Sequence, residues 1–217
     1  MARIVFDLDG TLVDSAPDLH AIASSLLAAG GHAPITLEQA RSYIGQGVAV
    51  FVSRMRAARG IPETGQAALL ASFMARYETA VTLTRLYPSV DHSLIALRRL
   101  GHRMALCTNK PMAPTLALLR HLNLERHFDK IVAGDSLPTR KPDPAPLLAA
   151  FQIGGAGPDL FVGDSEVDAE TASRAGIPLL LFTQGYRSAP AHTLTHHAAF
   201  ADFNDLPGLI AQFGQSP

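Results

Sequence analysis

The sequence predicts an α/β fold: a doubly wound, Rossmann-like parallel sheet core with an inserted all-helical cap domain. From about residue 86 onward, apolar segments of strand length alternate with segments whose apolar residues recur at helical spacing. The strand-like segments are almost continuously apolar, which is typical of parallel strands buried on both faces. Clusters of Asp, Thr, Asn and Gly follow several of them, at the sheet edge where such folds bind ligands.

The first predicted strand, residues 4–6, stops at two acidic residues, Asp7 and Asp9, which Gly10 follows. Residues two apart in an extended chain point to the same side, so we expect both carboxylates to face one ligand. Two ionised carboxylates that close repel each other, and a divalent cation or a proton on one of them relieves the repulsion. The structural alternative is an Asx turn that simply ends the strand.

Residues 16–82 have only helical patterns, with no strand pattern among them. Ser15 is a predicted N-cap for the first helix, and Thr36 with Gln39 predicts a capping box for a second helix that runs to Gly45. Two more amphipathic stripes follow before residue 82.

The strand and helix patterns divide the chain into two parts. We expect an α/β catalytic core of residues 1–15 and 83–217, and a helical cap of residues 16–82 inserted after the first strand and placed to close over the site. Within the core, the predicted strands are residues 103–107, 130–133, 160–162, 179–182 and 198–200, and predicted helices follow near residues 94–100, 116–122, 147–151, 166–176 and 206–210.

The polar residues at the strand ends suit magnesium-assisted phosphoryl transfer to a carboxylate. Asp7 is the predicted nucleophile, and Asp9 is the predicted acid and base for the leaving group and the attacking water. Thr108 would donate its hydroxyl to a phosphoryl oxygen, and Lys141 would offset the charge of the phosphate and of a carboxylate.

Magnesium prefers hard oxygen ligands in an octahedron and keeps several waters. The predicted Mg²⁺ ligands are the carboxylates of Asp7 and Asp164 and the backbone carbonyl of Asp9, with Asp168 expected behind them. Taken singly, Asp164 and Asp168 have a structural explanation as a helix N-cap and a first-turn acid. Their joint occurrence with the other polar residues at one sheet edge favours the catalytic interpretation.

Four segments resemble, in order and spacing, the motifs of the haloacid dehalogenase-like hydrolases: residues 7–15 (DLDGTLVDS), 108–110 (TNK), 141–144 (KPDP) and 163–168 (GDSEVD). The resemblance implies an aspartyl-phosphate intermediate on Asp7. In this family an acid two residues after the nucleophile is typical of phosphatases and is lacking in dehalogenases, so Asp9 implies a phosphatase.

Four less specific motifs resemble the bacterial phosphoglycolate phosphatases: residues 44–47 (IGQG), 86–88 (LYP), 108–111 (TNKP) and 183–187 (TQGYR). This resemblance implies a small phosphorylated acid such as 2-phosphoglycolate as the substrate. Gly45 and Gly47 would let the cap backbone approach a small substrate, and Asn109 is a further candidate for substrate binding. A flexible turn is the alternative for the two glycines. The family's Pro-Gly-Val is Pro-Ser-Val here, and the change at Ser89 predicts an altered backbone at that turn.

Composition and charge limit the classes of binding partner that we expect. A net charge of −1 with 17% charged residues argues against nucleic acid, and no apolar run approaches the roughly 18 residues of a membrane span. The N-terminus lacks the pattern of a signal peptide, and the single cysteine, Cys107, excludes an internal disulfide, so we expect a cytoplasmic protein whose partner is its small-molecule substrate. The oligomeric state is not predicted.

Other functions remain open on the sequence alone. The same core would serve a phosphatase of sugar phosphates or nucleotides, or a mutase similar to β-phosphoglucomutase. A non-catalytic module that binds a phosphorylated ligand is a more remote alternative. Arg41, Arg54 and Arg56 are expected to be solvated, although one of them is also a candidate for contact with a substrate carboxylate.

Overall fold

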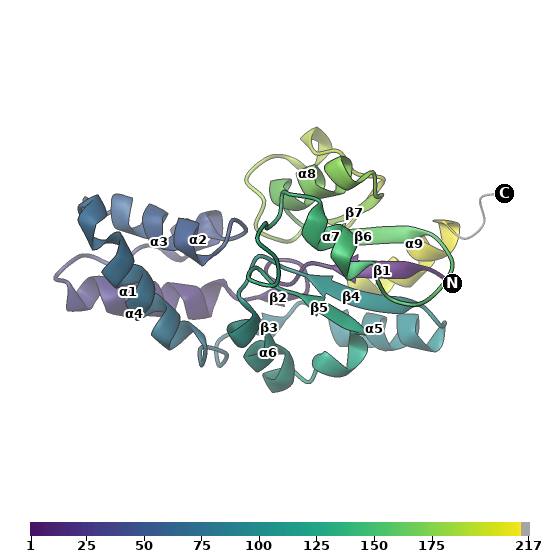
Figure 1. Ribbon diagram of the computed structural model, residues 1–217, viewed down its shortest axis with the longest axis horizontal. Coiled ribbons are helices and arrows are strands. Elements are labelled where there is room, and N and C mark those ends of the chain that lie inside the picture. The colour runs from purple at the N-terminus through teal and green to yellow at the C-terminus, as the bar shows by residue number, and fades with distance from the viewer. Residues whose placement is uncertain (214–217) are drawn as a thin grey trace.

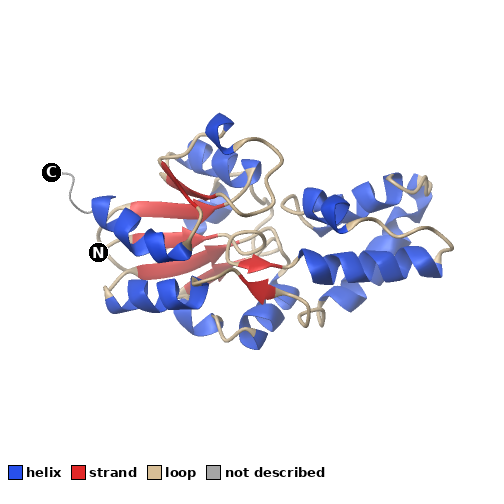
Figure 2. Ribbon diagram, turned by 180° about the vertical axis from the view of Figure 1, so that it is seen from behind, coloured by secondary structure: helices blue, strands red, loops and turns tan. Residues whose placement is uncertain are grey.

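A computed structural model describes residues 1–213 and confirms the predicted fold class. Six parallel strands form one sheet in the order β5-β4-β1-β6-β7-β8 (Figures 1 and 2). The strands are β1 (Arg3–Phe6), β4 (Arg103–Cys107), β5 (Lys130–Val132), β6 (Asp159–Gly163), β7 (Leu179–Phe182) and β8 (Ala198–Phe200).

Strand β1 lies at the centre of this sheet, between β4 and β6, with Ile4 paired to Met104 on one side and to Leu160 on the other. The chain runs outward from β1 in one direction first and then in the other, so β1 is the point where the strand order reverses. In doubly wound sheets the ligand crevice lies at this point, outside the carboxyl ends of the strands. The loops that follow β1, β4 and β6 therefore have the position of a binding site.

Helices cover both faces of the sheet, which accounts for the almost continuously apolar strands. Ile4 and Phe6 pack into one buried cluster, while Val5 between them packs into the cluster on the opposite face. The first cluster takes residues from α5 (Val90–Arg99), α6 (Met112–His121) and α9 (Leu206–Phe213), and the second from α7 (Ala145–Ala150) and α8 (Glu166–Ala175).

Four helices form the helical insertion, on the side of the sheet away from the N-terminus (Figure 1). They are α1 (Ala16–Ala29), α2 (Leu37–Tyr43), α3 (Val48–Ala57) and α4 (Gln66–Tyr77). They bury a cluster of their own around Phe51 and Phe73. The capping box of Thr36 and Gln39 is confirmed, whereas the predicted end of α2 at Gly45 is wrong, because the helix stops at Tyr43. The exact division between core and cap stays a prediction.

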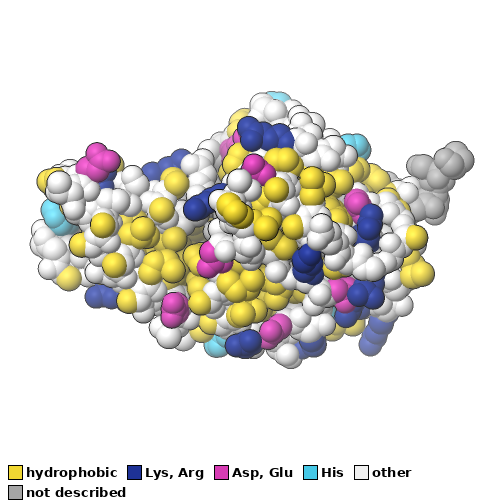
Figure 3. All heavy atoms as spheres, in the orientation of Figure 1, with side chains coloured by type: hydrophobic (Ala, Val, Ile, Leu, Met, Phe, Trp, Pro, Cys, Tyr) yellow, Lys and Arg dark blue, Asp and Glu magenta, His cyan; other side chains and the backbone are white. Residues whose placement is uncertain are grey.

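Short 3-10 helices complete the described chain: Glu63–Gly65, Glu125–His127, Ala191–Thr193 and Phe203–Asp205. Within residues 1–213, no helix has both the length and the apolar character needed to cross a membrane. On the face shown in Figure 3, acidic and basic side chains are interspersed among apolar ones.

The two connections between the sheet and the helical insertion are held side by side. Strand β2 (Val13–Asp14) pairs antiparallel with β3 (Arg85–Leu86), a two-stranded ribbon that the sequence did not predict. Ser15 is the N-cap residue of α1 as predicted, but its hydroxyl donates to Asp9 at 2.6 Å and makes no capping hydrogen bond to the helix. The residue before α1 therefore belongs to the acidic turn.

Ser89 precedes α5 with a φ of 65°, in the left-handed region. The altered backbone that the serine predicts is not observed, because Ser89 takes a conformation that glycine adopts readily. Its hydroxyl accepts a hydrogen bond from the Asn204 amide at 2.9 Å, which helps to hold the turn.

Asp18 links the two connections between the sheet and the helical insertion by hydrogen bonds. Its buried carboxylate accepts hydrogen bonds from the backbone N–H of Leu83 at 3.2 Å and from the N–H and hydroxyl of Thr84, both at 2.7 Å.

We expect Asp18→Ala to lower the free energy of unfolding by about 2–4 kcal/mol, because these buried donors lose a charged acceptor. Urea denaturation measures the change, and Glu38→Ala, at an exposed first-turn acid of α2, is the control, with an expected change below about 0.5 kcal/mol. Equal stability of the two variants would contradict this role.

Candidate active site

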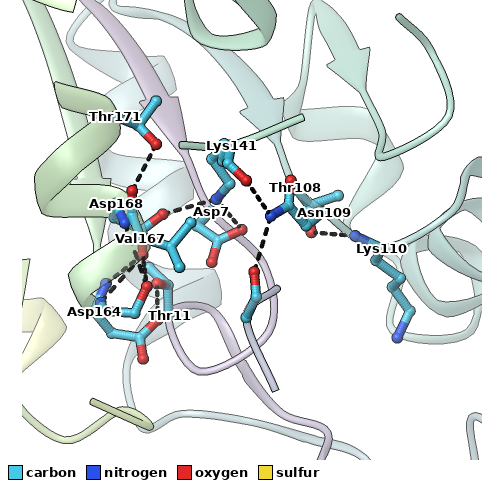
Figure 4. A network of polar contacts seen from close by, with 12 residues as sticks. Asp7, Thr11, Thr108, Asn109, Lys110, Lys141, Asp164, Val167, Asp168 and Thr171 are labelled. Carbon is cyan, nitrogen blue, oxygen red and sulfur yellow. Dashed lines mark hydrogen bonds and ion pairs between the residues drawn. The ribbon is translucent and has the colours of Figure 1, made fainter. Parts of the chain in front are cut away.

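The loops at the carboxyl edge of the sheet bring the predicted residues together (Figure 4). Asp7 directly follows β1, Thr108 follows β4 and Asp164 follows β6. Lys141 comes from the loop between β5 and α7, and Asp168 lies in the first turn of α8. Residues more than 150 positions apart in the chain thus meet because parallel strands end at the same edge.

Three buried acids form a cluster, and one ammonium group pairs with two of them. Carboxylate oxygens of Asp7, Asp164 and Asp168 all lie within 4.8 Å of one another. The Nζ atom of Lys141, itself buried, lies 2.8 Å from Asp7 Oδ1 and 2.7 Å from Asp168 Oδ1. One lysine offsets only one of the three negative charges, so the cluster requires further positive charge or protons.

The pKa values reflect this imbalance. Burial raises the pKa of Asp7 to about 7, although Lys141 opposes the shift. Burial and the neighbouring carboxylates of Asp168 and Asp7 raise the pKa of Asp164 well above its ordinary value. Burial opposes the charge of Lys141, but Asp168 and Asp7 raise its pKa overall, so this lysine stays protonated. A divalent cation would provide the compensation that the acids otherwise obtain from protons.

Asp168 differs from the other two acids because its oxygens already have partners. Oδ1 accepts from Lys141, and Oδ2 accepts from the backbone N–H groups of Asp164 and Ser165, both at 3.1 Å, and from the Ser165 hydroxyl at 2.7 Å. Asp164 accepts one bond at each oxygen, from the Thr11 hydroxyl and from the backbone N–H of Tyr186, both at 2.7 Å. The donor set fits a hard cation held by Asp7 and Asp164, with Asp168 holding Lys141 and the start of α8.

A pocket lies between this sheet edge and the helical insertion. Asp7 and Asp9 both line it, as their spacing predicted. The core also contributes Thr108, Asn109, Lys110 and Pro111, and the insertion contributes Leu19, Ile44, Gly45, Gly47, Val48, Phe51 and Tyr77. The carboxylate of Asp9 is outside the acidic cluster, so a role for Asp9 in holding a metal rests on its backbone carbonyl.

Asp9 and Thr108 are held by neighbouring polar groups. Asp9 Oδ1 accepts from the Ser15 hydroxyl at 2.6 Å and from Lys110 Nζ at 3.3 Å. The Thr108 hydroxyl oxygen accepts from the backbone N–H of Lys110 at 3.2 Å, which leaves the hydroxyl proton available for a ligand. Both side chains are therefore oriented before any substrate binds.

Asn109 connects the core to the helical insertion. Its side-chain amide donates to the carbonyl of Gly45 and to the carbonyl of Lys141, each at 2.9 Å. Gly45 and Gly47 both have positive φ, 108° and 88°, so the turn between α2 and α3 takes a conformation that favours glycine. Asn109 thereby holds this turn in place above the pocket. Contact of Asn109, Gly45 and Gly47 with substrate stays a prediction.

Comparison with known proteins places this geometry in a family. The profile of the haloacid dehalogenase-like hydrolases matches residues 4–182, most of the chain. The chain belongs to the haloacid dehalogenase-like hydrolases. A phosphoglycolate phosphatase of Cereibacter sphaeroides is 49% identical over 213 residues, which cover 97% of this chain and 98% of that protein. One of Rhodobacter capsulatus is 44% identical, with 95% of each chain covered.

Two solved structures share the whole fold. A predicted phosphoglycolate phosphatase from Haemophilus somnus superposes with a TM-score of 0.88 at 32% identity, covering 96% of this chain and 97% of that one. A predicted phosphatase from Clostridium acetobutylicum, at 19% identity, has a TM-score of 0.82 over 97% of this chain and 98% of its own, and shows the fold alone.

Several residues that surround Asp164 in this haloacid dehalogenase-like hydrolase were not predicted as site residues. Thr11 and Tyr186 hydrogen-bond to its carboxylate, and an added methyl group at Gly10 or Gly185 would overlap with it. The Tyr186 hydroxyl also donates to Asp14 at 2.6 Å, at the start of the insertion. The available signals were the 7–15 motif, which contains Gly10 and Thr11, and the 183–187 motif, which contains Gly185 and Tyr186; both are far from Asp164 in the sequence.

Proposed function

We propose that this protein is a phosphoglycolate phosphatase, a magnesium-dependent phosphomonoesterase that acts through an aspartyl-phosphate intermediate. The observation that carries the proposal is the placement of Asp7 and Asp9 in one pocket, with Asp7 also in the acidic cluster that Lys141 partly neutralises. The names of the two bacterial relatives, similar over almost the full length, support the substrate.

In the first step, an oxygen of Asp7 attacks the phosphorus atom, and the bond between phosphorus and the ester oxygen breaks. Asp9 donates its proton to that oxygen, and glycolate leaves. The Thr108 hydroxyl and the Lys141 ammonium hold phosphoryl oxygens while charge develops on them. Lys141 remains next to Asp7 throughout, because the buried carboxylate of Asp168 fixes it from the other side.

In the second step, water attacks the phosphorus atom of the aspartyl-phosphate, and Asp9, now ionised, accepts a proton from that water. The bond to the Asp7 oxygen breaks, which releases phosphate and restores the carboxylate. The apolar residues that the insertion places around the pocket, among them Val48 and Phe51, limit access of bulk water to the intermediate.

Asp7, Asp164 and the carbonyl of Asp9 would hold the magnesium ion. When bound, Mg²⁺ supplies positive charge to the transferred phosphoryl group and to the acidic cluster. Thr11 and Tyr186 would hold the Asp164 carboxylate in place to bind the ion.

Phosphate release from a panel of small phosphomonoesters tests the proposal. We expect the purified protein to hydrolyse 2-phosphoglycolate in the presence of Mg²⁺, with a higher kcat/KM than for sugar phosphates or nucleotides. Removal of divalent cations with EDTA should abolish the activity, and added Mg²⁺ should restore it. Full activity after metal removal would contradict the metal assignment, and conversion between phosphosugar isomers with little free phosphate would instead identify a mutase.

A further inference from the structure

Lys110 is a buried cation of the core that lines the pocket on the side facing the helical insertion. Its Nζ atom lies 2.7 Å from the Tyr77 hydroxyl and 4.3 Å from the centre of the Tyr77 ring. A further contact, 3.3 Å, is made to Asp9. Figure 4 shows the Lys110 side chain directed away from the cluster of Asp7, Lys141 and Asp168. The pocket therefore has a second positive charge, separate from the one that Lys141 provides.

Two hydrogen-bond donors remain available at this end of the pocket. The ammonium group has three N–H bonds and uses two, for Asp9 and for the Tyr77 hydroxyl oxygen. The Tyr77 hydroxyl accepts from Lys110, and within residues 1–213 it has no acceptor for its own proton. A phenol is neutral and an ammonium group is charged at neutral pH, so Tyr77 is a neutral donor and Lys110 a charged one.

The three arginines of the insertion that are candidates for contact with a substrate carboxylate are engaged elsewhere. Arg41 pairs with Asp14, Arg54 donates to the Ser42 carbonyl and Gln46, and Arg56 donates to Gln66 and the Ile61 carbonyl. None of the three lines the pocket. The pocket lining on the insertion side is otherwise apolar or glycine, so a charged group on the substrate finds one lysine there.

We propose that Lys110 and Tyr77 bind the carboxylate of the substrate and so set the preference for a small phosphorylated acid. The inference rests on the proposed function, because it assigns the residues that recognise the end of the substrate opposite the phosphate. A carboxylate has two oxygens, which match the free ammonium N–H and the phenol O–H. Since Lys110 comes from the core and Tyr77 from α4, the bound acid would also hold the insertion against the sheet.

Two substrates that differ only at this end test the inference: 2-phosphoglycolate and 2-hydroxyethyl phosphate, in which a hydroxymethyl group replaces the carboxylate. We expect Lys110→Met to lower kcat/KM for 2-phosphoglycolate about 10- to 100-fold, mainly through KM, because a charge-assisted contact is lost. The kcat/KM for 2-hydroxyethyl phosphate should fall by a smaller factor, which measures the loss of the Lys110–Asp9 contact, so the ratio of the two kcat/KM values reports the contact with the carboxylate. Tyr77→Phe, which removes only the hydroxyl, should reduce the same preference by a smaller factor and provides the answer if Lys110→Met does not fold.

Arg140→Met is the matched control. The Arg140 side chain is exposed and packs against Gly47 without lining the pocket, so its removal should leave the preference for the acid unchanged. An equal loss for both substrates in Lys110→Met would overturn the inference, because Lys110 would then act only through Asp9. Loss of the preference in Arg140→Met alone would also overturn it. A wild-type enzyme that hydrolyses both substrates equally would refute the substrate of the proposed function and this inference together, whereas a preference that survives in Lys110→Met and Tyr77→Phe refutes the inference alone.

Discussion

Asp7→Asn should lower kcat/KM for 2-phosphoglycolate by roughly 10⁴-fold or more, because an amide cannot form the aspartyl-phosphate. The substitution keeps the size of the side chain and removes one of three crowded negative charges. Since burial raises the pKa of Asp7, the ionised carboxylate is unfavourable in the metal-free fold. We therefore expect the free energy of unfolding of metal-free Asp7→Asn to equal or exceed that of the wild type.

Phosphate release and thermal unfolding, measured on the same preparation, separate the catalytic effect from a structural one. Asp202→Asn makes the same chemical change at an exposed residue that caps a short helix and should retain full activity. Activity within about tenfold of the wild type in Asp7→Asn would show that another group is the nucleophile. Inactivity accompanied by a large loss of stability would show that Asp7 has a structural role instead.

Lys141→Met should cause the largest loss of stability, about 3–5 kcal/mol, because it leaves the cluster of Asp7, Asp164 and Asp168 without its cation. Methionine has a similar length, so little volume is lost in this buried position. Hydrolysis of 2-phosphoglycolate should also fall by about 10²- to 10³-fold or more, since the phosphoryl oxygens lose a charged partner. Urea denaturation and steady-state kinetics measure the two effects.

The double variant Lys141→Met with Asp168→Asn distinguishes these contributions. Removing the charge of Asp168, which pairs with Lys141 at 2.7 Å, should restore part of the lost stability but none of the lost activity. Recovery of activity together with stability would mean that Lys141 serves the fold and has no direct part in catalysis.

Much of the fold could be predicted because its main determinants are local patterns. Apolar runs such as residues 103–107 and 179–182 have the length of strands, and both form strands as expected. The β2–β3 ribbon could not be predicted, since strands of two residues have no periodicity. The end of α2 was placed two residues too late, because the sequence does not show where the tight turn of Gly45 and Gly47 begins.

The candidate site could be predicted where each residue directly follows a strand or lies in a distinctive motif. Asp7, Thr108 and Asp164 follow β1, β4 and β6, so fold class alone brings them to one edge. Lys110 and Tyr186 were missed for a different reason. Their importance depends on partners far away in the sequence, Tyr77 and Asp164, and no pattern along the chain reveals which side chains meet across the pocket.

The central claim is that Asp7 carries the phosphoryl group during turnover, and chemical trapping of that group is its most direct test. The enzyme is mixed with Mg²⁺ and 2-phosphoglycolate, quenched in acid and treated with borohydride, which reduces an aspartyl-phosphate to homoserine. Mass spectrometry of the peptides then locates the change. The mechanism predicts homoserine at position 7 and at no other aspartate, and none without substrate. Modification of Asp9 or Asp164 instead, or no modification while phosphate is being released, would contradict it.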